Sequence, residues 1–170
     1  MKRLTAAVVA LMFFGIAPAS AHQPVVLLDS DTTPAAGPLL VDGTISFAIR
    51  ASFNKAGQKK AFRAQLQEGD QLAVQYLIVD KRPENKLKNS QLPQLVITSP
   101  SGKRTVMKFT ERTAFYEPWG RTNYFYLGRL SEVGEAGIYS FVATARAKAA
   151  ITIAVGEKEM AGEVLRDSAS

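Results

Sequence analysis

Apolar residues alternate with polar ones along short stretches of this sequence, and this alternation constrains the fold more than any other feature. Residues 44–53 read TISFAIRASF, in which every second residue from Ile45 to Phe53 is apolar. Such a period of two is typical of a strand with one buried face. Further strands are expected within 61–66, 71–80, 94–109 (two strands joined by a turn), 123–130, 134–145 and 149–155.

These runs predict about eight or nine strands, with no convincing amphipathic helix between them. Residues 81–93 form a polar loop that has room for a short helical turn. Close, regular strands separated by turns favour an antiparallel β-sandwich over a parallel sheet. Tyr139, which follows the turn GEAG, is expected to tie down a loop through its hydroxyl.

The first 21 residues have the composition of a secretory signal. Lys2 and Arg3 precede the apolar run LTAAVVALMFFGIA, and the small residues 19–21 form a cleavage pattern. The run is shorter than the roughly 20 residues of a spanning helix, so we expect a secreted or periplasmic protein whose mature chain has no transmembrane anchor. The rest is expected to be one β-sandwich domain over 22–155 and a polar tail over 156–170.

The charge of the expected mature chain is mildly positive. Without Lys2 and Arg3, 19 basic residues stand against 15 acidic ones, in short clusters beside turn residues. Such loops either keep a protein soluble or attract anionic polymers outside the cell, and for an exported protein we expect no nucleic-acid partner. The sequence has no cysteine, which excludes disulfides, thiolate metal sites and cysteine nucleophiles.

The sole histidine, His22, stands directly after the expected cleavage site. As a first mature residue it would offer an amine and an imidazole, a pair that can chelate copper. The alternative is that its position is incidental to processing. A histidine brace usually draws a second imidazole from the fold, so here a methionine, a carboxylate or a partner protein would have to complete the site.

The scarcity of histidine also argues against catalysis. A Ser-His-Asp triad would need His22 to reach a serine from the chain terminus. No carboxylate pair stands in a context typical of glycosidases, and no glycine-rich phosphate loop is present. We therefore expect a protein that is not an enzyme.

Asp29 and Asp31 are the best candidates for a hard metal ion such as calcium. They are separated by one residue in LDSDTT, and calcium prefers carboxylate and carbonyl oxygens. The alternative is that these side chains form a turn by accepting hydrogen bonds from nearby backbone amides.

The segment FYEPWGRTNYFY, residues 115–126, holds six of the thirteen aromatic residues that follow position 21. Its centre is a turn, which places Trp119 at or near a loop apex. Exposed there, Trp119 and Tyr116 could stack on sugar rings, with Arg121 favouring an anionic ligand. The alternative is that the rings fill a corner of the core, because aromatics supply much of the buried area in all-β proteins.

Four stretches together resemble the bacterial pre-peptidase C-terminal domain, a small extracellular β-sandwich of the jelly-roll kind. They are residues 29–45, the strand pair 61–78, the hairpin 94–103 and the turn and strand 134–145. The resemblance implies a jelly-roll-like sandwich and an accessory role in binding or secretion beside exported enzymes. Relatives often carry an acidic residue where this chain has Lys59 and Lys60, so the resemblance lends a calcium site no support.

These features together predict an exported, non-catalytic binding or accessory module. The expected ligand is a glycan or an anionic polymer of the cell envelope, bound through Tyr116, Trp119 and Arg121, and a protein partner is also possible. The alternative function is copper binding by the mature terminus at His22.

Overall fold

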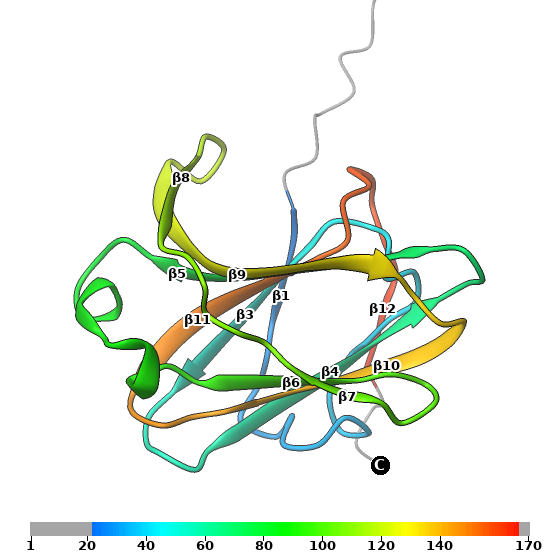
Figure 1. Cartoon of the computed structure of the whole chain (residues 1–170), viewed down its shortest axis with the longest axis horizontal. Helices are drawn as coiled ribbons and strands as arrows, with labels where there is room; N and C mark the ends of the chain where they lie inside the picture. The colour runs from blue at the N-terminus through cyan, green and yellow to red at the C-terminus, as the bar shows by residue number, and fades with distance from the viewer. Residues whose placement is uncertain (1–21, 167–170) are drawn as a thin grey trace, which may run out of the picture.

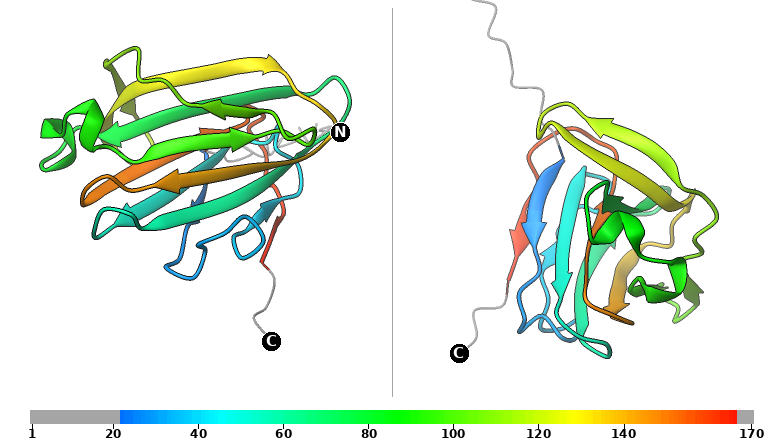
Figure 2. Two further views of the ribbon diagram at one scale, coloured as in Figure 1. Left: turned by 60° about the horizontal axis from the view of Figure 1, so that its bottom comes forward. Right: turned by 90° about the vertical axis from the view of Figure 1, so that its left-hand side faces the viewer.

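The computed structural model describes residues 22–166, which form two sheets packed face to face (Figures 1 and 2). Within these residues no helix is long and apolar enough to span a membrane. The first sheet has the strand order β1 (Gln23–Val26), β3 (Phe47–Phe53), β11 (Ala149–Val155), β5 (Gln71–Val79), β9 (Thr122–Val133) and β8 (Thr113–Glu117). The second has the order β12 (Val164–Leu165), β2 (Leu39–Leu40), β4 (Lys59–Leu66), β10 (Gly137–Thr144), β6 (Gln94–Thr98) and β7 (Arg104–Val106).

The predicted all-β sandwich is confirmed, but the strand number is corrected. Residues 22–166 contain twelve strands instead of eight or nine, because β1, β2, β8 and β12 did not stand out in the sequence. The sheets are also mixed: β1 runs parallel to β3 and β2 parallel to β4, while the other pairs are antiparallel. The polar loop expected at 81–93 contains two short 3-10 turns, Glu84–Lys86 and Asn89–Gln91.

The core lies between the sheets, where the alternating apolar residues meet. In β3 every second side chain from Phe47 to Phe53 is buried, as the alternation predicts. Phe62 of β4 and Phe141 of β10 stack in the second sheet with ring centroids 4.4 Å apart. Tyr139 ties down its loop as expected, since its hydroxyl accepts a hydrogen bond from the Glu135 N–H at 2.7 Å.

The expected polar tail follows the edge of the sandwich up to residue 166. Gln23 and Gly162 exchange two hydrogen bonds, at 2.9 and 3.0 Å, between the Gln23 amide and the glycine backbone. Beyond them, β12 pairs with β2. Arg166 then forms an ion pair with Asp31 at 2.9 Å, so the last described residues are attached to the first loop of the domain.

The β8–β9 hairpin curves out of the plane of the first sheet (Figure 1). The pairing of β9 with β5 shifts register so that Leu127 is an extra residue, a β-bulge, and bulged strands bend. Next to the bulge, a side chain at Gly128 would collide with the carbonyl of Lys108. Glycine there allows the connection from β7 to pass close beneath β9.

Candidate functional site

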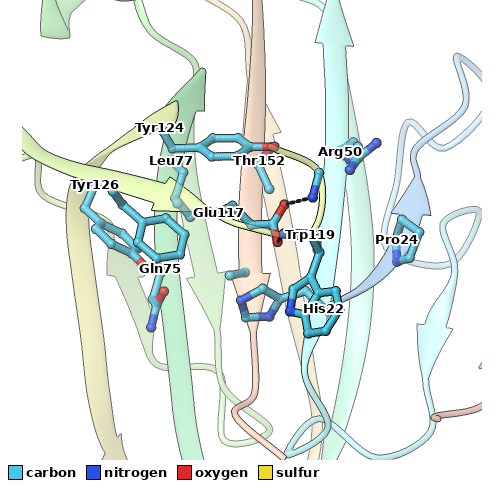
Figure 3. A pocket seen from close by; sticks show the side chains of 14 residues that line it. His22, Pro24, Arg50, Gln75, Leu77, Glu117, Trp119, Tyr124, Tyr126 and Thr152 are labelled. Carbon is cyan, nitrogen blue, oxygen red and sulfur yellow. Dashed lines mark hydrogen bonds between the residues drawn. The ribbon is translucent and has the colours of Figure 1, made fainter. Parts of the chain in front are cut away.

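A cavity of about 210 Å³ lies on the outer face of the first sheet, beneath the curved hairpin (Figure 3). Its floor comes from the outward-facing residues of β3, β11 and β5, and its wall comes from β8 and β9. This volume is below the roughly 300–1,000 Å³ of sites for drug-sized ligands. The space therefore suits one small ring, with the rest of a longer ligand outside.

The floor is a depression because its central side chains are small. Ala154 and Thr152 of β11 stand beside Ala48 of β3, in the middle of the sheet. The strand register brings Arg50, Thr152, Leu77 and Tyr126 into one row across four strands. In this row Thr152 is smaller than its neighbours Arg50 and Leu77, which leaves space for a ligand above it.

Aromatic rings form the wall on the hairpin side. Tyr124 and Tyr126 alternate along β9 and both face outward, while Phe125 between them packs against the core. Phe115 lies opposite Tyr124 in the register, and its ring is 5.0 Å from that of Tyr126. Burial raises the pKa of the Tyr126 phenol, which therefore remains a neutral hydrogen-bonding group at physiological pH.

A side-chain-stabilised turn holds Trp119 at the rim of the cavity. Both carboxylate oxygens of Glu117 accept backbone hydrogen bonds, one from the Trp119 N–H at 2.8 Å and one from the Gly120 N–H at 2.6 Å. Trp119 is 64% exposed and lines the cavity together with His22 (Figure 3). The apex predicted for Trp119 is confirmed, and its ring is available to a ligand.

His22 lines the same cavity, which brings together two candidates that lie far apart in the sequence. Its Nδ1 is hydrogen-bonded to the hydroxyl of Ser46. Nδ1 is the ring nitrogen near enough to the backbone to close a chelate with the residue's own amine, so this contact competes with the arrangement needed for copper. Across residues 22–166, no three His, Cys, Asp or Glu side chains gather closely enough to hold a metal ion.

Asp29 and Asp31 point to different partners. Asp29 pairs with the buried ammonium of Lys60 at 2.9 Å. Asp31 is buried, pairs with Arg166 and accepts a hydrogen bond from the Leu28 N–H at 2.7 Å. Asp31 thus fixes the loop 27–31 as in the turn-forming alternative, whereas the described partners of Asp29 are the side chains of Lys60 and Gln58.

The other two predicted ligand residues lie outside the cavity lining. Tyr116 alternates with Phe115 and Glu117, so its ring, 54% exposed, projects from the opposite side of β8. Arg121 is exposed at the end of the turn, where it has a positive φ of 50°. Of the three, the structure places only Trp119 in the cavity.

Sequence reasoning missed the residues that complete the site. The spacing of Tyr124 and Tyr126 correctly puts them on one face, but that face could equally have been the core. Arg50 and Gln75 are polar residues of β3 and β5, and only the pairing of strands brings them to the cavity. No family model matches the sequence, and the search of curated proteins finds no match either.

Proposed function

We propose that this protein is an exported, non-catalytic binding module that holds a glycan on the outer face of its first sheet. The observation that carries the proposal is the open cavity with Trp119, Tyr124 and Tyr126 around it. Flat aromatic rings stack on the apolar faces of sugars, and a few polar groups at the edge fix orientation. Arg50, Gln75 and Thr152 supply such groups here.

The composition of the lining favours binding over hydrolysis. Glu117 is the one carboxylate among the described residues that line the cavity, whereas the usual glycosidase mechanism requires two, flanking the scissile bond. Both oxygens of Glu117 already accept hydrogen bonds from the turn. The carboxylate therefore shapes the site.

The test uses the chain's single tryptophan as an internal probe. Because Trp119 is exposed at the rim, a stacking oligosaccharide should shift its fluorescence emission to shorter wavelength and protect it from quenching by iodide. Titration with a panel of envelope oligosaccharides should give a saturable change. No saturable change with any member of the panel would contradict the proposal.

A matched pair of tyrosine variants separates the loss of a ligand contact from a general loss of hairpin structure. By calorimetry, Tyr124→Ala should weaken binding roughly tenfold or more, as expected for a central aromatic contact. Tyr116→Ala removes a similar ring from the other side of the hairpin and should leave affinity unchanged. Equal losses in both variants would indicate that the hairpin contributes only through its folding.

A further inference from the structure

One cationic side chain of the cavity lining, that of Arg50, forms no hydrogen bond or ion pair within the described part of the chain. Arg50 projects from the middle of β3 to the outer face, and within residues 22–166 its guanidinium has no hydrogen-bond or ion-pair partner. Burying an arginine without a partner is costly, but Arg50 is exposed at the edge of the cavity, where a ligand can reach it. Its availability distinguishes it from Arg112 and Arg129 of the hairpin side.

Two arginines of the hairpin side are already engaged, while Arg121 is exposed outside the cavity lining. Arg129 forms an ion pair with Glu111 at 3.0 Å and stacks over the Tyr126 ring, with the guanidinium carbon 4.1 Å from the ring centroid. Arg112 donates a hydrogen bond to the Asn85 carbonyl at 2.8 Å. These arginines stabilise the hairpin, whereas Arg50 is left for recognition.

The one carboxylate in the lining does not neutralise Arg50. Both oxygens of Glu117 face the N–H groups of their own turn, and no ion pair joins Glu117 to Arg50. The remaining polar groups include strong donors: the guanidinium of Arg50 and the amide of Gln75. A donor-rich edge favours a ligand that carries an anionic acceptor.

The strand register sets the distance between this donor and the aromatic wall. Arg50 and Tyr126 end one row that crosses β3, β11, β5 and β9. Three strand spacings separate their backbones by roughly 14 Å, and both side chains line the cavity between them. A ligand that meets both must therefore carry its anionic group away from the ring face that stacks on the aromatics.

We propose that the cavity selects an acidic glycan, whose sugar ring stacks on Trp119 and Tyr124 while Arg50 binds the carboxylate of a uronic acid residue. The planar guanidinium offers two parallel N–H groups that match a carboxylate. This inference rests on the proposed glycan binding and adds the charge of the ligand. It also gives Arg50 a role that its position on an exposed sheet face does not otherwise explain.

The test compares one oligosaccharide in two charge states. The probes are an oligogalacturonate and the same oligosaccharide after chemical reduction of its carboxyl groups, titrated by calorimetry into the protein. The wild-type chain should prefer the acidic form roughly tenfold to a hundredfold, as expected for hydrogen bonds to a charged group. The preference should diminish as salt is raised.

Two variants of equal charge make the result specific. Arg50→Gln should lower affinity for the acidic form to that of the reduced form, while Arg104→Gln, at an exposed position on β7 of the other sheet, should keep the preference. Trp119→Ala should weaken binding of both forms. Melting curves are expected to match the wild type, because both arginines are exposed.

The outcomes separate the two proposals. If the wild type binds both forms equally, or if Arg50→Gln retains the preference, the acidic ligand is refuted and glycan binding stands. If Arg104→Gln lowers the preference as much as Arg50→Gln, the effect is general charge attraction and the role of Arg50 is refuted. If neither form nor any neutral glycan binds, glycan binding fails and the inference fails with it.

Discussion

The ion pair between Asp31 and Arg166 gives the sharpest prediction about stability, because it joins the C-terminal strand to the first loop of the domain. The Asp31 side chain is only 3% exposed and that of Arg166 is 35% exposed. The guanidinium reaches both carboxylate oxygens, at 2.9 and 3.1 Å, and also donates to the Val26 carbonyl at 2.6 Å. Removing Arg166 therefore leaves a buried carboxylate with one remaining donor, the Leu28 N–H.

The expected cost follows from this geometry. Breaking a buried pair from one side typically costs about 3–5 kcal/mol, but the partial exposure of Arg166 lets water replace the lost donors, and the bond from Leu28 persists. We therefore expect Arg166→Ala to lower the free energy of unfolding by about 2 kcal/mol. For a chain of this size that corresponds to a fall of roughly 4–8 °C in Tm.

The assay is a double-mutant cycle by urea unfolding. Asp31→Asn removes the charge but keeps an oxygen for the Leu28 N–H, so Arg166→Ala should cost under about 0.5 kcal/mol in that background. Arg104→Ala, an exposed arginine on β7, is the control and should stay within about 0.5 kcal/mol of the wild type. If Arg166→Ala lowers the free energy of unfolding equally with and without the Asp31 charge, the ion pair does not attach the C-terminal segment to the domain, and the reasoning is refuted.

Two other predictions concern the core and the response to acid. Tyr76 is fully buried and donates a hydrogen bond to the Pro93 carbonyl at 2.8 Å, so Tyr76→Phe should cost about 1–2 kcal/mol in urea unfolding; an unchanged midpoint would contradict this. Burial alone would raise the pKa of Asp42, but hydrogen bonds from Thr44 and the charge of Lys158 hold it below its ordinary value. A carboxyl whose pKa is lowered by folding stabilises the protein above about pH 4, and that contribution is lost as the pH falls through the folded pKa. The unfolding free energy of Asp42→Asn should therefore fall less steeply with acid than that of the wild type, and parallel curves would show that Asp42 does not contribute.

The strands that could be predicted are those in which the order of apolar and polar residues matches the order of buried and exposed side chains. Residues 47–53 alternate in the structure as they do in the sequence, because one face of β3 meets the core and the other does not. The four missed strands carry no such signal. The two residues of β2, Leu39–Leu40, are extended because β4 and β12 lie on either side of them, and that pairing depends on contacts far along the chain.

The candidate site likewise contains one residue that could be placed from the local sequence and others that could not. Trp119 could be placed at an exposed apex, because Glu117 and Gly120 are residues of a local turn and the structure shows them bonded within that turn. That Arg50 and Tyr126 line one cavity could not be predicted, since only the register of three successive strand pairs places them in the same row. A shift of one residue in any of these pairs would move an outer residue to the core face.

The concave shape of the site depends on two local irregularities more than on the aromatic residues themselves. The outer face of a regular sheet carrying small side chains such as Ala154 would be nearly flat and would offer a ligand little contact. The bulge at Leu127 bends β9, and the carboxylate of Glu117 fixes the turn, so the hairpin returns over that face. The same rings on a straight hairpin would extend into solvent beyond the sheet edge. The cavity therefore forms where a bent hairpin meets a row of small residues, which explains why Tyr116, equally aromatic but on the other side of the bend, lies outside it.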